Sequence, residues 1–191
     1  NYPKTILAVW SFKRKHFPDG SLNKHKARLC AHGGMQQWGI HYWETFAPVV
    51  NWLSVRLVLV LAILHDLPVR SIDFVLAFPQ SDLDVPIFME LPAGFAMKIG
   101  NKGEYVIELK KSLYGLKQAG LNLYEKLKKG LTDRQFVPSQ VDPCVFISTR
   151  IIVLTYVDDC IIMAKCEQDI RDLITSLCTG DENFDFTNEG D

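Results

Sequence analysis

The 191-residue sequence lacks any apolar run long enough to cross a bilayer, because the longest uninterrupted one spans only residues 57–64. A transmembrane helix needs about 20 apolar residues, so we expect no membrane segment. The first residues are not followed by the apolar core of a secretory signal peptide. Cysteine is scarce, with five residues and no C-x-x-C pair. This excludes a disulfide framework and indicates reduced thiols in an intracellular protein.

The composition also excludes disordered, collagen-like and coiled-coil chains, since 48% of the residues are hydrophobic and 23% are charged. The length suggests one compact domain or two small lobes that share a core. The net charge of −1 conceals four blocks: residues 1–41 carry +6, 42–97 carry −4, 98–134 carry +5 and 135–191 carry −8. The alternation favours a polyanion-binding surface beside a carboxylate-rich centre, although two solvated charged faces would give the same pattern.

Hydrophobic periodicity and turn residues predict a mixed fold. Strands are expected at residues 8–12, 26–31, 69–78, 86–89, 105–109, 144–147, 151–156 and 161–163. Helices are expected at residues 55–65, 118–132 and 167–178. The first helix is apolar nearly all round, so it is expected to be buried, with Ser54 as its N-cap. Because strands and helices do not alternate strictly, the predicted class is α+β.

Two adjacent carboxylates, Asp158 and Asp159, interrupt an apolar stretch that would otherwise form one buried strand. Burying an unpartnered carboxylate is costly, so the pair must lie at an exposed turn or hold a cation. Asp73 is a similar acid inside the apolar segment 69–78, with a surface turn or pairing with Arg70 as the alternatives. If the two strands are neighbours, the acids converge on one point. Hard oxygen ligands of this kind suit Mg²⁺, and two such ions can support phosphoryl transfer.

Five motifs follow one another along the chain: Lys26-Ala27-Arg28-Leu29, Glu44-Thr45-Phe46-Ala47-Pro48-Val49, Ile72-Asp73-Phe74-Val75-Leu76-Ala77-Phe78, Ser112-Leu113-Tyr114-Gly115-Leu116-Lys117-Gln118-Ala119 and Tyr156-Val157-Asp158-Asp159. In this order and spacing, the series resembles the reverse transcriptase of copia-type LTR retrotransposons, over about residues 10–186. The chain departs from that family at Gly120-Leu121-Asn122-Leu123, where the family usually has Pro-Arg and a nearby Trp.

The resemblance implies the fingers–palm fold of a polymerase, with an antiparallel palm sheet and helices packed on one of its faces. Residues 1–48 and 80–117 would form the fingers, and residues 49–79 and 118–191 the palm. The thumb and the RNase H domain would lie outside this chain.

The resemblance also assigns roles to individual residues. Asp73, Asp158 and Asp159 would be catalytic and would hold two Mg²⁺ ions, or Mn²⁺ in their place. The residues that would bind the incoming nucleotide are Lys26, Arg28, Phe74, Phe78 and Gln118. The two cations would hold the triphosphate, with the choice between them left open. Phe78 would lie under the sugar, which requires a bend in the chain after Asp73 because strand side chains alternate between faces.

The function implied is RNA-directed DNA polymerase, a nucleotidyltransferase that extends a primer on an RNA or DNA template. Its partners would be the template–primer, deoxynucleoside triphosphates and the remaining polyprotein, which comprises thumb, RNase H and integrase. It would act inside the cell, in a cytoplasmic virus-like particle or the nucleus. The alternatives are an inactive or domesticated fragment that only binds nucleic acid, and another palm-type enzyme such as a nucleotidyl cyclase. Primer extension on an RNA template with Mg²⁺ tests the first alternative, and a product assay with nucleotide and no template tests the second.

Four tryptophans occur within the first 52 residues, and they are expected to pack in the core or between lobes, with base stacking as the alternative. They are Trp10, Trp38, Trp43 and Trp52.

Overall fold

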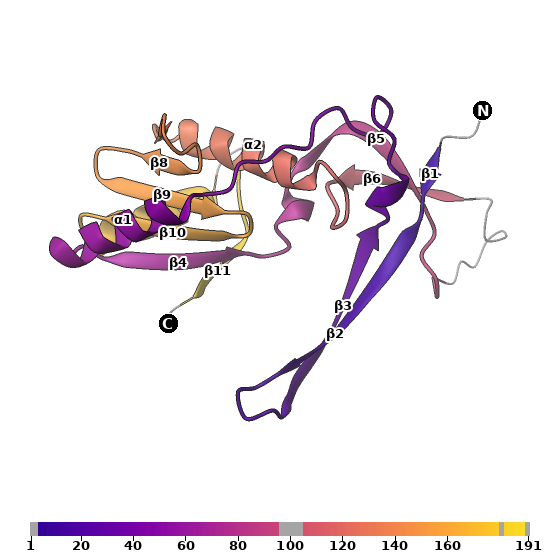
Figure 1. Ribbon diagram of the computed structural model, residues 1–191, viewed down its shortest axis with the longest axis horizontal. Coiled ribbons are helices and arrows are strands. Elements are labelled where there is room, and N and C mark those ends of the chain that lie inside the picture. Colours follow the sequence, from indigo (N-terminus) through magenta and orange to yellow (C-terminus); the bar gives the residue numbers. More distant parts are fainter. Residues whose placement is uncertain (1–3, 96–104, 180–181, 190–191) are drawn as a thin grey trace. The chain divides into compact units, whose positions relative to one another are not determined.

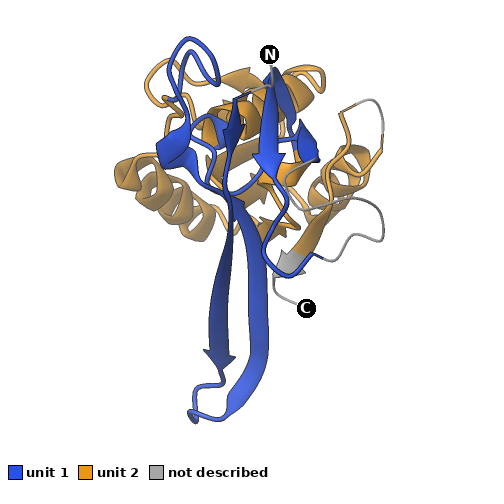
Figure 2. Ribbon diagram, turned by 90° about the vertical axis from the view of Figure 1, so that its right-hand side faces the viewer, with its two compact units in different colours: residues 1–45, 81–119 blue, residues 46–80, 120–191 orange. Residues whose placement is uncertain are grey.

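The computed structural model describes residues 4–95, 105–179 and 182–189. The chain forms two compact units, coloured separately in Figure 2. Unit 1 comprises residues 1–45 and 81–119, and unit 2 comprises residues 46–80 and 120–191.

Unit 1 contains a three-stranded sheet and a separate two-stranded hairpin (Figure 1). In the sheet, β5 lies between β1, which runs parallel to it, and β6, which runs antiparallel. The strands are β1 (Thr5–Ile6), β2 (Ala8–His16), β3 (Leu22–Ala31), β5 (Asp82–Glu90) and β6 (Val106–Lys111), and a short 3-10 helix, η1, covers Gly33–Met35.

The hairpin of β2 and β3 confirms the predicted one but is longer at both strands. Its turn is closed by a hydrogen bond from the Gly20 N–H to the Phe17 carbonyl, 2.9 Å, and Gly20 has the positive φ of 86° that favours glycine. Asp19 Oδ1 accepts hydrogen bonds from the N–H and the hydroxyl of Ser21. The predicted strands are too short because most residues of β2 and β3 are exposed, so their sequence shows no alternation of apolar and polar residues.

Gly115 lies in the Ser112–Ala119 motif at a point where two backbones meet. A Cβ atom at this position would lie 2.2 Å from the Ala31 carbonyl oxygen, and Gly115 also has a φ of 91°. The neighbouring Tyr114 carbonyl accepts a hydrogen bond from the Ala31 N–H, 2.8 Å. A glycine is therefore required for this segment to lie against the end of β3.

Unit 2 is built on a six-stranded antiparallel sheet in the order β11-β4-β10-β9-β8-β7 (Figure 1). The strands are β4 (Val69–Phe74), β7 (Val137–Pro138), β8 (Val145–Ile147), β9 (Ile151–Tyr156), β10 (Asp159–Ala164) and β11 (Phe186–Glu189). The helices are α1 (Trp52–Leu64), α2 (Ala119–Thr132) and α3 (Glu167–Leu177), and a short 3-10 helix, η2, covers Phe78–Gln80. The mixed, antiparallel α+β architecture agrees with the prediction.

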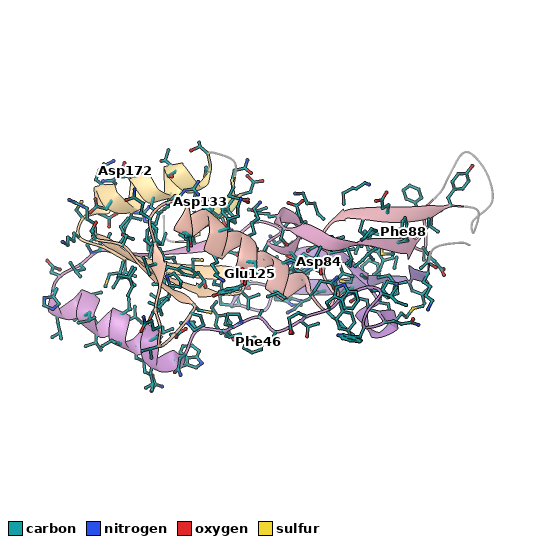
Figure 3. The ribbon with its side chains drawn as sticks, turned by 90° about the horizontal axis from the view of Figure 1, so that it is seen from above. Phe46, Asp84, Phe88, Glu125, Asp133 and Asp172 are labelled. Atoms are coloured by element: carbon teal, nitrogen blue, oxygen red, sulfur yellow. The ribbon has the colours of Figure 1, made fainter. Side chains whose placement is uncertain are left out.

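Strands β9 and β10 are apolar on both faces, so both faces of the sheet are covered. Val153 and Ile162 pack in one core cluster with residues of α2 and α3, whereas Leu154 and Met163 pack in another with Val58 of α1. The prediction that all three helices pack on one face is therefore wrong. In Figure 3, Glu125 and Asp133 mark α2, Asp172 marks α3, and Asp84 and Phe88 mark β5 of unit 1.

Helix α1 differs from its prediction in two respects. Its N-cap is Asn51, whose side chain accepts from the Leu53 N–H, while the Ser54 hydroxyl instead donates to Asp142. The helix is also not buried: Val58 and Ala62 are its only buried residues, and a wide apolar stripe faces outward. No helix in the described part of the chain is long and apolar enough to span a membrane.

Strand β4 ends four residues earlier than predicted, at Phe74. A turn follows in which Leu76 has a φ of 49°, and η2 begins at Phe78. The chain thus bends between Asp73 and Phe78. Such a bend is required if these two side chains are to face the same side.

Candidate active site

The acidic residues are brought together by the register of β4 and β10. Asp73 on β4 lies directly opposite Asp159 on β10, and Asp159 is also paired with Tyr156 on β9. Directly opposed residues in an antiparallel pair point to the same face and lie close together. Val157 and Asp158 form the two-residue turn that joins β9 to β10. All three predicted acids therefore lie at one end of these strands.

The turn that carries Asp158 is strained. Val157 has a φ of 54°, a conformation that β-branched residues rarely adopt and that costs about 1–3 kcal/mol. A positive φ at the first of two central residues is typical of a type II′ hairpin turn, where glycine is preferred. The Asp158 carbonyl accepts a hydrogen bond from the Phe74 N–H, 3.0 Å. This hydrogen bond connects the turn to β4, the strand that carries Asp73.

The carboxylates repel one another. Partial burial, and then the negative charge of Asp73, raise the pKa of Asp159 above its ordinary value. Asp158 is half-buried, and its Oδ1 atom is fully enclosed. A cation between these groups would relieve the repulsion.

The donor atoms suit a hard divalent cation, because Mg²⁺ commonly takes one or two protein carboxylates and completes its shell with water and substrate phosphates. The opposed pair Asp73 and Asp159 meets that requirement. Within residues 4–95, 105–179 and 182–189, however, no three His, Cys, Asp or Glu side chains lie close enough together to hold a metal by themselves. Asp73 and Asp159 therefore offer one pair of carboxylates rather than a complete set of metal ligands.

A cavity of about 390 Å³ opens beside Asp159 on the face of the sheet that α1 covers. Its lining is mainly apolar: Val50, Trp52, Val55, Ser71, Leu154, Tyr156, Asp159 and Ile161. Asp159 thus borders a space large enough for a small ring system.

The two predicted aromatic residues occupy different environments. The Phe74 ring is 3% exposed and packs against Phe184 and Phe186, with ring centroids 5.5 and 6.0 Å away. Phe74 thus supports the Asp73 strand from the core. Phe78 is half-buried and packs on the edge of the same core cluster. Contacts of Phe74 and Phe78 with a nucleotide remain a prediction.

Comparison with known proteins identifies the chain. The family model for reverse transcriptase (RNA-dependent DNA polymerase) matches residues 1–190. The chain belongs to the reverse transcriptase family. The resemblance to copia-type retrotransposon enzymes, drawn from five short motifs, is thereby confirmed.

Relatives of this reverse transcriptase chain include two plant proteins. It is 41% identical over 157 residues to the retrovirus-related Pol polyprotein from transposon RE1 of Arabidopsis thaliana, a match covering 80% of this chain and 11% of that protein. It is 40% identical over 167 residues to the counterpart from transposon TNT 1-94 of Nicotiana tabacum, covering 85% and 12%. The Saccharomyces cerevisiae transposon Ty1-NL2 Gag-Pol polyprotein is 29% identical over 177 residues, covering 92% and 10%. The chain spans about a tenth of the length of these relatives.

In the reverse transcriptase hairpin, Lys26 and Arg28 point to one face of β3, because they are two residues apart. Lys26 lies opposite Lys13, and Arg28 lies opposite Ser11. The Arg28 guanidinium stacks on the Tyr114 ring, 3.8 Å from its centroid, which fixes the side chain. The hairpin therefore presents a cationic face with one preorganised arginine.

Gln118 is fully buried, and its amide is satisfied within unit 1. Its Nε2 donates to the His41 carbonyl, 2.7 Å, and its Oε1 accepts from Gln36 Nε2, 2.8 Å. Gln36 Oε1 in turn accepts from the Lys117 N–H, 2.7 Å. In this conformation the Gln118 side chain connects two loops of unit 1. A contact between Gln118 and a nucleotide remains a prediction.

Gln36 and Gln80 are structural residues near the predicted sites that the sequence did not reveal. Gln80 Nε2 donates to the carbonyls of Val75 and Asp185, and its Oε1 accepts from the Asp185 N–H. This amide holds the bend after β4 against the segment before β11. Since Gln80 and Asp185 are 105 residues apart, no local pattern signals the contact.

Proposed function

We propose that this chain is the fingers–palm part of an RNA-directed DNA polymerase, and that it extends a primer on an RNA or DNA template. The observation that carries the proposal is the register that opposes Asp73 and Asp159 beside the Asp158 turn. Membership of the reverse transcriptase family supports it.

Residues 1–48 and 80–117 would be the fingers, and residues 49–79 and 118–191 the palm. The compact units support this division, since their boundaries fall within a few residues of these positions. The cationic hairpin belongs to unit 1 and the acidic residues to unit 2, which is the distribution expected for fingers and palm.

Asp73, Asp158 and Asp159 would hold two Mg²⁺ ions, with Mn²⁺ as a substitute. When bound, such ions lower the pKa of a primer 3′-hydroxyl and neutralise charge on the leaving phosphates. The primer 3′-hydroxyl would lose its proton to water, and its oxygen would form a bond to the α-phosphorus while the bond from that phosphorus to the β-phosphate oxygen breaks, releasing pyrophosphate. The chain supplies the anionic face on which these groups are oriented, and the hydrogen bond from Phe74 to Asp158 keeps the acidic turn in place.

Further residues would contribute to nucleotide binding. Lys26 and Arg28 would neutralise the triphosphate, a task that suits charge-assisted hydrogen bonds. Phe74 and Phe78 would shape the sugar site, and Gln118 would support the nucleotide pocket. The partners would be a template–primer, deoxynucleoside triphosphates and the remaining polyprotein, inside the cell in a virus-like particle or the nucleus.

Primer extension by a polyprotein that contains this chain tests the proposal. Asp73→Asn and Asp159→Asn should each reduce extension at least a thousandfold, because the negative charge is lost while the shape is kept. Asp172→Asn, on the exposed surface of α3, is the matched control and should retain full extension. Retained activity in either active-site variant would refute the carboxylate assignment. Template binding without extension by the unmodified protein would favour the binding-only alternative.

A further inference from the structure

Helix α1 is fixed in one rotation about its axis within unit 2. Its inner residues Val58 and Ala62 pack in a core cluster with residues of β9 and β10. Its first turn is held by Asp142, whose Oδ2 accepts hydrogen bonds from the Asn51 N–H, 2.9 Å, and from the Ser54 hydroxyl, 2.6 Å. The face of α1 that lies away from the sheet therefore cannot turn inward to become buried.

The outward face of α1 carries an apolar seam. Side chains spaced alternately by four and three positions lie in line along one side of a helix, which is the spacing of a coiled-coil contact. The residues with this spacing are at least half exposed, and they are Leu53, Leu57, Val60 and Leu64. Trp52 and Ile63 lie beside them and are 69% and 81% exposed. These six residues together are called the α1 seam.

The α1 seam is larger than the apolar patches of ordinary monomers. Its six side chains expose on the order of 700 Å² of apolar area, whereas the largest apolar patch of a typical monomer covers about 300–600 Å². A standard protein interface covers about 800 Å² on each partner. The exposed area therefore approaches what one side of a stable dimer contact needs.

The composition of the outward face suits a second copy of the same helix. Arg56 is the single charged residue of α1, so the seam offers no pattern of charges that a charged partner could match. Leucine and valine side chains at seam spacing interlock as knobs and holes with an identical seam. A two-fold dimer brings the same patch of both subunits together, which requires only that the patch be complementary to itself.

Arg56 favours an antiparallel arrangement of the two helices. In a parallel pair in register, the two Arg56 side chains would lie at the same height and repel each other. In an antiparallel pair centred between Leu57 and Val60, they are separated by five residues, or about 7 Å along the helix axes. The positive end of each helix dipole then lies beside the negative end of the other. This arrangement places Leu57 against the partner's Val60, and Leu53 against the partner's Leu64.

We propose that the α1 seam is the interface of a two-fold symmetric homodimer of this chain, in which the two α1 helices pack antiparallel. Burial of the apolar side chains drives the association, and Arg56 stays at the rim of the contact. The inference goes beyond the polymerase assignment and does not depend on it, because none of the three acidic residues of the candidate active site belongs to α1.

Sedimentation velocity of the full chain tests the proposal. At about 100 µM the unmodified chain should sediment as a dimer, because interfaces of this size bind with Kd values of about 1 µM or tighter. Val60→Lys should weaken dimerisation about a hundredfold or more, since it places an unpaired charge in each half of the contact. Val141→Lys makes the same change at a 95% exposed position before β8 and should leave the Kd within about twofold.

A second variant tests the orientation and keeps the test decisive if the first fails to fold. Leu57→Glu alone should also give a monomer, with the circular dichroism spectrum of the unmodified chain. An equimolar mixture of Leu57→Glu with Val60→Lys should dimerise again, because the antiparallel arrangement places the new acid of one copy against the new base of the other. In a parallel dimer these charges would lie in different layers, and mixing would not restore association.

Three results would overturn the proposal. Monomeric sedimentation of the unmodified chain at the same concentration would assign the α1 seam to another segment of a longer polyprotein. A dimer that persists in both folded seam variants would place the interface on another face. An equal loss of dimer in Val141→Lys would show that added charge, rather than the seam, governs association. A mixture that stays monomeric would overturn the antiparallel arrangement.

Discussion

The backbone N–H of Phe74 donates a hydrogen bond to the carbonyl oxygen of Asp158, 3.0 Å away in the turn between β9 and β10. Phe74 follows Asp73 directly, so one bond joins the strand of the first acid to the turn that presents the second. Together with the pairing of Asp73 and Asp159, this backbone hydrogen bond defines the acidic centre. These backbone contacts should persist when the carboxylates are changed.

The strained turn gives the first prediction. Val157→Gly should increase the free energy of unfolding by about 1 kcal/mol, because glycine tolerates a φ of 54° that valine resists. Denaturant unfolding measures the change. Val137→Gly, at an exposed position in β7, should instead lower stability by about 0.5–1 kcal/mol. Loss of stability in Val157→Gly would show that the turn is not strained.

The buried amide network gives the second prediction. Gln118→Ala should lower the free energy of unfolding by about 2 kcal/mol, because the buried Gln36 amide and the His41 carbonyl lose their short hydrogen bonds to Gln118 and keep only the 3.5 Å contact with each other. Gln37→Ala, at an exposed position nearby, should change it by less than 0.5 kcal/mol. An unchanged stability in Gln118→Ala, with a raised nucleotide Michaelis constant, would make Gln118 a ligand-binding rather than a structural residue.

Phe78 gives the third prediction, which depends on the proposed function. If its ring fills the space of a ribose 2′-hydroxyl, Phe78→Val should raise ribonucleotide incorporation, relative to deoxyribonucleotide, about tenfold or more. Single-nucleotide extension with both substrates measures this ratio. A parallel loss for both nucleotides, or a lower melting temperature alone, would mean that Phe78 only packs on the core cluster that it borders.

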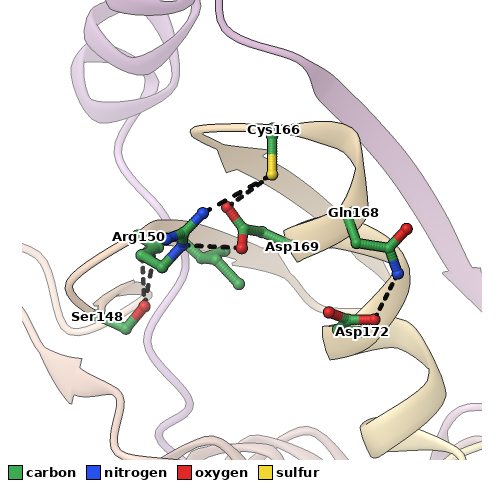
Figure 4. Close-up of polar contacts among 7 residues, drawn as sticks. Ser148, Arg150, Cys166, Gln168, Asp169 and Asp172 are labelled. Atoms are coloured by element: carbon green, nitrogen blue, oxygen red, sulfur yellow. Dashed lines mark hydrogen bonds and ion pairs between the residues drawn. The ribbon is translucent and has the colours of Figure 1, made fainter.

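The ion pair between Arg150, in the turn before β9, and Asp169 on α3 gives the fourth prediction (Figure 4). Hydrogen bonds from Arg150, followed by Cys166, lower the pKa of Asp169 below its ordinary value of 3.8. A lowered carboxyl pKa stabilises the folded state above pH 3.8, and this contribution is lost as the pH falls through the folded-state pKa. Arg150→Gln should therefore lower the melting temperature at pH 6. The difference in melting temperature between this variant and the unmodified protein should become smaller as the pH falls below 3.8.

Arg171→Gln, on the exposed surface of α3, is the control for this pair. Its effect on the melting temperature should be the same at pH 6 and below pH 3.8. A destabilisation by Arg150→Gln that is equal at pH 6 and below pH 3.8 would contradict the assigned ion pair.

Tertiary contacts decided features that local patterns did not reveal. The sequence of α1 is apolar nearly all round, which predicted a buried helix. It does not show that Leu57, Ile63 and Leu64 remain exposed. The four tryptophans were expected to pack in the core or between lobes, yet Trp38, Trp43 and Trp52 are 67%, 57% and 69% exposed. A hydrophobic side chain favours burial, but whether another element covers it depends on packing.

The sequence by itself determined the elements whose signals are local. A continuous apolar run defined β9 at residues 151–156, the i, i+3, i+4 stripe defined α3 to within one residue, and the Asp-Asp interruption located the β9–β10 turn. These features depend on neighbours a few residues apart, whose side chains set the backbone directly. Only the tertiary structure opposed Asp73 to Asp159, buried Gln118 against Gln36 and added β11 beside β4. Such pairings join residues about 80 to 115 positions apart, and their partners are selected by the packing of the whole unit rather than by any local preference.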